Sequence, residues 1–183
     1  MIITPTNFRE WAIKCHEDTN HFYDDKLPYE YHLNLAVKIG EKFKHLLGNG
    51  VWGWVKDAII SHDTIEDVRQ NYNSIIKAAI KFGHSNSDSK KIAEAVRAVT
   101  NYGRGRDRDE RMPDYVYKEI RETEGAIFVK LVDRLANVKH GLISESTMRK
   151  KYLKEQPHFK EMLYIEEYKE MWNYLDKLLT IEI

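Results

Sequence analysis

Cysteine is nearly absent from this chain, which has only Cys15 among its 183 residues. A single cysteine excludes an intramolecular disulfide, and it fits a reducing compartment, so we expect a cytoplasmic protein. Cys15 lies in an amphipathic pattern, which predicts a small buried side chain rather than a nucleophile. Residues 1–5 lack a basic stretch followed by an apolar one, so we expect no signal peptide.

Long hydrophobic runs and a surplus of one charge are lacking as well. No run approaches the roughly 18 apolar residues of a membrane span, so no membrane partner is expected. Lysine plus arginine equals aspartate plus glutamate, 29 each, and the formal net charge is zero. This balance argues against general nucleic-acid binding, although a local basic patch could still hold one small phosphorylated ligand.

Convincing strand alternation, internal repeats and long linkers are also missing. Apolar residues make up 42% of the chain and recur at helical spacing nearly throughout, which is enough to build a sizeable core. We therefore predict an all-α fold, with residues 1–183 forming one compact bundle of about eight to nine helices.

Prolines, glycines and capping residues divide this pattern into helices. One helix is expected to begin after Thr4 or Thr6, and a second to run from Pro28 to about Leu47 after an aspartate-rich turn. Further helices are expected over about 51–67, 73–83, 87–101, 113–121 and 126–138. Residues 144–183 predict one or two C-terminal helices with Pro157 between them.

The polar side chains that follow Ile59-Ile60-Ser61 are the most informative feature of the chain. They are His62, Asp63, Glu66 and Asp67. In a continuous helix, His62 and Glu66 would share one face, and Asp63 and Asp67 a neighbouring face. Three clustered carboxylates repel one another, so a divalent metal ion is the expected partner.

Two further polar residues lie in apolar surroundings. Asp133 falls in the most apolar segment of the chain, so it should be ion-paired, capping or metal-bound. Arg134 is an alternative partner, but neighbours in a helix point about 100° apart. His32 lies in an apolar neighbourhood, and a lone helical histidine is more often a surface or core residue than a metal ligand.

The order of these residues, His32, then His62-Asp63, then Asp133, resembles the HD superfamily of metal-dependent phosphohydrolases. Residues 62–67 (HDTIED) resemble the HDxxED signature of the hydrolase domain in RelA/SpoT-type alarmone enzymes and their small stand-alone relatives. Residues 28–32 resemble the PYxxH segment of that family, and residues 130–137 resemble its KLxDRxxN segment. The resemblance spans roughly residues 10–140, with the C-terminal helices of 144–183 beyond it.

The resemblance implies an HD-type helical bundle with one divalent metal ion, typically Mn²⁺. Its ligands would be His32, His62, Asp63 and Asp133. Two imidazoles and two carboxylates also suit Fe²⁺ or Zn²⁺, and affinity alone does not choose among them.

The same resemblance assigns the neighbouring polar residues to catalysis and substrate binding. Glu66 and Asp67 would be the catalytic acids that handle the metal-activated water, with a solvated helix end as the alternative. Asn137, one turn after Asp133, would contact the sugar or phosphate of a nucleotide.

The chain departs from the family pattern where many members carry an Arg-Lys pair that holds the guanine nucleotide. The corresponding residues are Tyr23-Asp24, and Lys26 is the only nearby cation. Tyr23 could stack on a base, whereas Asp24 would repel a phosphate. The substrate contacts are therefore expected to differ.

An arginine-rich segment supplies a second candidate for substrate binding. Arg104, Arg108 and Arg111 could clamp a phosphate, as basic residues do in the family counterpart. A solvated, salt-bridged loop is the equally weighted alternative.

These observations favour a phosphohydrolase of a small phosphorylated nucleotide. The family substrate would be guanosine 3′,5′-bis(diphosphate), cleaved at its 3′-pyrophosphate, and no synthetase or regulatory region is expected. Tyr23-Asp24 keeps open an HD hydrolase of another nucleotide or phosphoester. An alternative from another functional class is a non-catalytic nucleotide-binding or regulatory module. The complete set of candidate ligands and acids disfavours this alternative.

Overall fold

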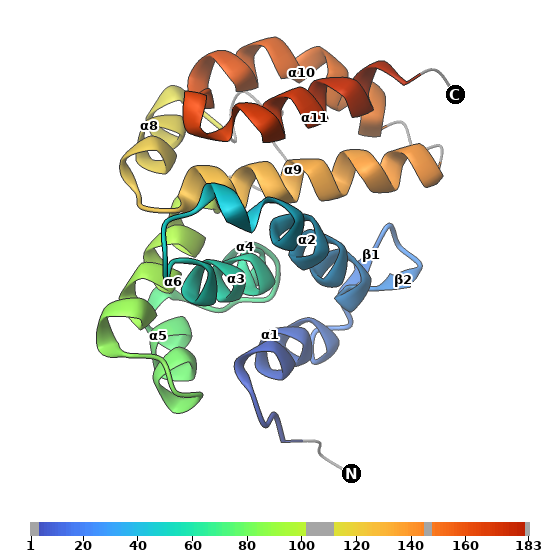
Figure 1. The fold of residues 1–183 in the computed structure, drawn as a ribbon. Coiled ribbons are helices and arrows are strands. Elements are labelled where there is room, and N and C mark those ends of the chain that lie inside the picture. The colour runs from blue at the N-terminus through green and yellow to red at the C-terminus, as the bar shows by residue number, and fades with distance from the viewer. Residues whose placement is uncertain (1–3, 102–111, 145–147, 182–183) are drawn as a thin grey trace.

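Helix α9 (Ala126–Ile143) lies between two groups of helices in the computed structural model, which describes residues 4–101, 112–144 and 148–181 (Figure 1). On one side it contacts α10 (Met148–Leu163) and α11 (Lys169–Thr180). On the other it contacts α2 (Glu30–Phe43), α3 (Trp52–Ser61) and α6 (Asn86–Val99). The predicted all-α fold is confirmed.

Shorter elements surround this arrangement. Helix α1 (Phe8–Glu17) packs against α3, α5 (Tyr72–Lys81) against α6, and α8 (Asp114–Glu122) against α6, α9 and α10. The remaining elements are α4 (Thr64–Asp67), the 3₁₀ turns Lys44–Leu46 and Glu166–Tyr168, and the strands β1 (Phe22–Tyr23) and β2 (Leu27–Pro28). The two strands pair antiparallel, so the aspartate-rich turn closes a small hairpin.

One hydrophobic cluster extends from Phe8 in α1 to Leu179 in α11. Helix α9 contributes Phe128, Leu131 and Leu135, all fully buried, which fits its dense apolar sequence. Cys15 is buried as predicted, and burial raises the pKa of its thiol to about 11.

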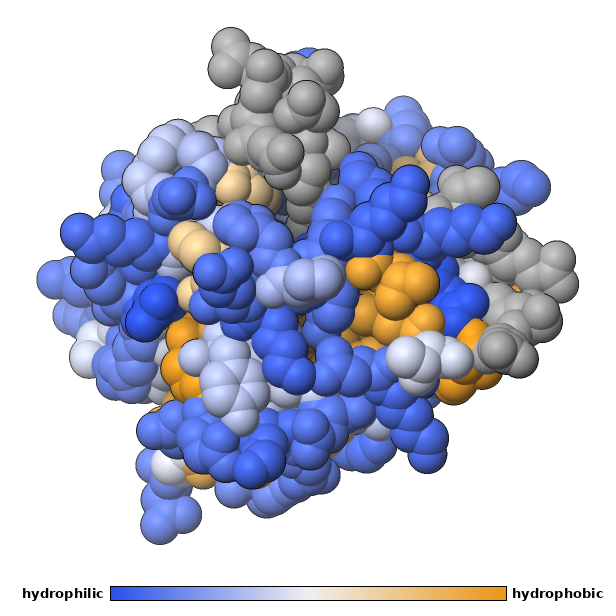
Figure 2. All heavy atoms as spheres, turned by 90° about the horizontal axis from the view of Figure 1, so that it is seen from above, coloured by the Kyte–Doolittle hydropathy of each residue, from blue (hydrophilic) through white to orange (hydrophobic). Residues whose placement is uncertain are grey.

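The surface on the side of α10 and α11 is mostly hydrophilic, with hydrophobic side chains exposed in separate places (Figure 2). Among the helices of the described ranges, none combines the length and apolarity that crossing a membrane requires.

The prediction that Pro157 separates two C-terminal helices is wrong. Pro157 lies inside α10, which continues to Leu163, and the backbone is extended at Ile165. A proline removes one helical hydrogen bond to the carbonyl four residues earlier. That carbonyl belongs to Leu153, whose side chain is exposed, so water can replace the lost donor. Burial of Phe159 then stabilises the continued helix.

Gly125 is where α9 begins, and it is expected to be sensitive to substitution. Its φ is +74°, and a Cβ there would lie 2.5 Å from Cη2 of Trp54, which is buried in α3. Gly125→Ala is therefore expected to lower the free energy of unfolding by about 2–5 kcal/mol, measured by denaturant titration.

Two other glycines separate the causes of this loss. Gly83 has a φ of +99° and open space around it, so Gly83→Ala should cost only the backbone strain, about 1–2 kcal/mol. Gly53 lies in α3 with open space and no positive φ, so Gly53→Ala should leave stability unchanged or raise it. Equal losses at Gly125 and Gly83 would show that the contact with Trp54 is unimportant.

Candidate metal centre

The HDTIED segment lies at a break between two helices, so the predicted continuous helix over 51–67 is wrong. Helix α3 ends at Ser61, His62 caps it, and Asp63 begins the single turn of α4. Side chains of the segment take up the terminal carbonyls. Ser61 Oγ donates to the Asp57 carbonyl (2.7 Å) and Thr64 Oγ1 to the Ser61 carbonyl (2.8 Å). These hydroxyls therefore supply donors to two carbonyls near the end of α3.

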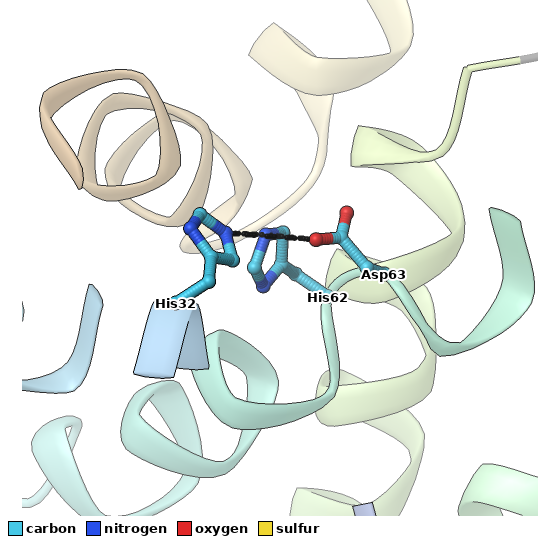
Figure 3. A group of neighbouring side chains, drawn as sticks. All are labelled: His32, His62 and Asp63. Atoms are coloured by element: carbon cyan, nitrogen blue, oxygen red, sulfur yellow. Dashed lines mark hydrogen bonds and ion pairs between the residues drawn. The ribbon is translucent and has the colours of Figure 1, made fainter. Parts of the chain in front are cut away.

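The break turns His62 toward His32 of α2. Figure 3 shows His32, His62 and Asp63 pointing toward one another, with His32 from one helix and the other two from the α3–α4 junction. One ligand atom from each lies within 4.8 Å of the others. The structure therefore brings together three of the four predicted ligands as a group that could hold a metal ion.

Asp133, the fourth predicted ligand, approaches the same point from α9. Its Oδ1 lies 3.5 Å from His32 Nε2 and 3.4 Å from His62 Nε2. The two Nε2 atoms are 3.3 Å apart, and Asp63 Oδ2 lies 3.6 Å from His32 Nε2 and 2.8 Å from His62 Nε2. Donor atoms from α2, from the α3–α4 junction and from α9 therefore converge on one small volume.

These separations fit a shared cation. Two donor atoms that each lie about 2.1 Å from a metal ion are about 3.0–3.5 Å apart for ordinary coordination angles. The tautomer fits as well, because His62 Nδ1 lies 2.8 Å from the Ile59 carbonyl. A hydrogen on Nδ1 leaves the Nε2 lone pair facing Asp63 and Asp133. The residues present therefore suit a divalent metal ion.

The pKa shifts within the group also indicate that a positive charge is stabilised between the two carboxylates. Burial disfavours a charge on His62, yet the carboxylates of Asp63 and Asp133 outweigh burial and raise its pKa well above the ordinary value. Burial likewise disfavours the charged form of both aspartates, but their contacts with the imidazoles hold each pKa well below the ordinary value. In the metal-free protein a proton on His62 supplies the positive charge that a metal would bring.

Tyr29 connects the metal-binding group with Asp67. Its hydroxyl donates to Asp63 Oδ2 at 2.5 Å and lies 3.3 Å from Asp67 Oδ2. Burial and the nearby carboxylates raise the pKa of Tyr29 well above its ordinary value, so the phenol keeps its proton. The ring of His16 stacks flat against Tyr29, with centroids 4.0 Å apart. The retained proton and the stacking on His16 thus hold the Tyr29 hydroxyl as a hydrogen-bond donor to Asp63.

The two predicted catalytic acids have different surroundings. Glu66 accepts from the backbone N–H of Asn101 (2.9 Å) and from its side-chain amide (3.2 Å), which ties α4 to the end of α6. Asp67 lies 4.0 Å from His21 Nε2. Burial first, and then repulsion from Asp63 and Glu66, raise the pKa of Asp67 to about 7. The surroundings of Asp67 thus bring the pKa of its carboxyl group close to neutral pH.

Asn137 is engaged with the fourth ligand. Its amide nitrogen donates to Asp133 Oδ1 (2.5 Å), and its Oδ1 accepts from the Tyr23 hydroxyl (2.9 Å). Tyr23 in turn stacks on His32, with centroids 4.6 Å apart. Tyr23 and Asn137, both predicted to bind substrate, therefore contact two of the candidate metal ligands, and such contacts help to fix ligand orientation.

Basic residues border the same region. Lys130 is buried, donates to the Val99 carbonyl (3.0 Å) and lies 3.8 Å from Asp133 Oδ2. Arg134 is buried too and pairs with Glu155 (3.0 Å) rather than Asp133, so the alternative partner for Asp133 is not used. A cavity of about 200 Å³ is bordered by Lys130 and Arg134 together with both acids and three of the four candidate ligands, His32, Asp63 and Asp133.

The remaining predicted substrate contacts are placed differently. Lys26 is exposed in the hairpin turn and does not border this cavity. Arg104, Arg108 and Arg111 lie outside the described residues. Asp24, which the sequence analysis expected to repel a phosphate, pairs with His140 at 3.0 Å.

Sequence reasoning missed the roles of Tyr29, His21 and Asn101. Tyr29 had a usable signal, since it lies three residues before His32 and can share a side of the chain with it. Asn101 and His21 carried none, because each is distant in sequence from the acid that it approaches.

No family model matches the chain, and neither a curated protein nor a solved structure matches it. Membership of the HD superfamily therefore stays a prediction that rests on the motifs.

Proposed function

We propose that the protein is a metal-dependent phosphohydrolase of the HD type. One observation carries the proposal: donor atoms of His32, His62, Asp63 and Asp133 converge to within 2.8–3.6 Å of one another in the five measured pairs, beside Asp67. A purely structural ion-pair network would not need two imidazole nitrogens facing two carboxylates next to a carboxyl with a raised pKa.

The roles of the residues follow from their positions. The four ligands would hold one divalent ion, with Mn²⁺ favoured and Fe²⁺ or Zn²⁺ as alternatives. When bound, that ion would supply Lewis-acid stabilisation of phosphoryl charge and an activated water. Asp67 would accept the proton of the attacking water, and Glu66 would hold the wall of the site through Asn101.

The proposed substrate is a small phosphorylated nucleotide. Water would attack phosphorus, the phosphoester bond to the ribose oxygen would break, and that oxygen would leave with a proton. For guanosine 3′,5′-bis(diphosphate) the products would be guanosine 5′-diphosphate and pyrophosphate. A second candidate is another nucleotide or phosphoester, because Tyr23-Asp24 stands where the family pattern has a basic pair that holds the guanine nucleotide.

The test offers guanosine 3′,5′-bis(diphosphate) and a panel of nucleoside mono-, di- and triphosphates to the protein with Mn²⁺. Turnover of the bis(diphosphate) that chelator abolishes is the expected result. Release of phosphate only from other nucleotides would transfer support to the second candidate. Activity that resists chelator, or no turnover of any compound with Mn²⁺, Fe²⁺ or Zn²⁺, would refute the proposal.

A further inference from the structure

A second cavity adjoins the one at the metal centre. It has a volume of about 180 Å³, and the two cavities share Asn137, Met148 and Tyr152 in their walls. A ligand that reaches across these shared residues could therefore occupy both. The two halves of such a ligand would contact different kinds of side chain.

The walls of the second cavity suit a flat aromatic group. Tyr23 and Tyr152 contribute rings to the wall of this cavity, which Gly141 also borders. The first cavity, by contrast, is bordered by carboxylates, imidazole and the basic groups of Lys130 and Arg134. A nucleotide has this same division, with a stacking base at one end and phosphates at the other.

Asp24 and His140 add a polar edge to the second cavity, in which they lie side by side. Asp24 Oδ2 is 3.0 Å from His140 Nε2. An ionised carboxylate only accepts, so Nε2 of His140 carries the hydrogen between the two side chains. His140 is 7% exposed, and its Nδ1 has no hydrogen-bond partner in the described part of the chain. Asp24 Oδ1 makes no hydrogen bond with a described residue either. Asp24 thus presents an acceptor oxygen at this cavity, which favours a ligand with hydrogen-bond donors there.

We infer that Asp24, oriented by His140, determines which base the enzyme accepts, by receiving hydrogen bonds from N–H groups on the edge of the base. This inference rests on the proposed function and names the substrate class within it. Guanine, with a ring N–H beside an exocyclic amino group, presents two adjacent donors. Hypoxanthine has the same ring N–H but lacks the amino group. The acidic residue that would repel a phosphate is therefore suited to the other end of the nucleotide.

The test compares the binding of guanosine 5′-diphosphate and inosine 5′-diphosphate by calorimetry, in chelator so that nothing turns over. The wild-type protein should bind the guanine nucleotide about tenfold more tightly, which is the size of one hydrogen bond to a charged acceptor. Asp24→Asn should reduce this preference to about threefold or less. Asparagine suits the site because the φ of residue 24 is +52°, a conformation that asparagine tolerates nearly as well as aspartate.

Asp25→Asn is the matched control. Asp25 is the next residue of the same turn, with a φ of +58° and an exposed side chain that borders neither cavity. It should keep the tenfold preference. A wild-type protein that binds both nucleotides equally, or an Asp24→Asn variant that still prefers guanine, would overturn the inference while turnover of nucleotides left the proposed function standing. A wild-type protein that neither binds nor hydrolyses a nucleotide would overturn both.

Discussion

Replacing Asp63 with alanine is expected to abolish both metal binding and turnover. Asp63 Oδ2 lies 2.8 Å from His62 Nε2 and 3.6 Å from His32 Nε2, so the variant loses a donor at the centre of the group. At a Mn²⁺ concentration of about a hundred times Kd, the wild-type protein should gain roughly 2.7 kcal/mol, or about 5–10 °C in Tm. Asp63→Ala should gain nothing, and its turnover should fall at least about a thousandfold.

The loss of metal binding must be distinguished from local unfolding. Asp63 is the N-cap of α4 and its side chain makes no capping hydrogen bond to that turn, but it does accept from the Tyr29 hydroxyl, so the Tm of the variant in chelator is compared with that of the wild-type protein. Asp18→Ala is a suitable control, because Asp18 is an exposed carboxylate that pairs with Lys14 across one helical turn, and such a pair contributes little to stability. Thermal scans with chelator and with Mn²⁺ separate the effects. A metal-dependent rise in Tm that survives in Asp63→Ala would exclude the proposed site.

The regular parts of this fold were predictable because helical periodicity is a local property of sequence. The apolar segment that follows Gly125 predicted a buried central helix, and α9 is that helix. Helix starts were less predictable where several capping residues occur together. Thr4, Thr6 and Asn7 could all cap α1, and only the structure shows that the Asn7 side chain accepts from the Glu10 backbone N–H.

The candidate site was predictable in its residue types but not in its local geometry. The order of His32, His62-Asp63 and Asp133 predicted a shared site. The structure groups His32, His62 and Asp63, with Asp133 Oδ1 3.4–3.5 Å from both imidazoles. The end of α3 at Ser61 was not predictable, because every residue from 59 to 67 is compatible with a helix. The end of α3 coincides with hydrogen bonds from the hydroxyls of Ser61 and Thr64 to backbone carbonyls instead of to water.

Contacts between distant residues account for the rest. Asn101 reaches Glu66 across 35 residues, and His140 reaches Asp24 across 116. One sequence contains no sign of such pairs, since they follow from how α4, α6, α9 and the hairpin pack. These contacts also form the polar edges of the two cavities. The sequence motifs therefore predicted which residues converge at the candidate metal centre better than they predicted which residues border the cavities.

Asp67→Asn is expected to lower kcat by about 10²- to 10⁴-fold while leaving the Kd for Mn²⁺ within about threefold of the wild-type value. The reason is its position: Asp67 contacts Tyr29 (3.3 Å) and approaches His21 (4.0 Å), but its carboxylate makes none of the close contacts of the four ligands. Steady-state kinetics with saturating Mn²⁺, paired with calorimetric titration of the metal, measure the two quantities separately. A large loss of metal affinity would make Asp67 a ligand instead.

Glu66→Gln provides the comparison that distinguishes proton transfer from structural support. Glu66 accepts two hydrogen bonds from Asn101, and a glutamine amide must turn one donor toward another, so this variant should lose both stability and turnover. Asp67 differs, because burial and neighbouring carboxylates raise its pKa to about 7, which means that its charge opposes folding in the metal-free protein. At pH 8 in chelator, Asp67→Asn should therefore have an unchanged or higher Tm. A variant that loses turnover without losing stability has lost a chemical group, whereas parallel losses in both variants would show that the pair only holds α4 in place.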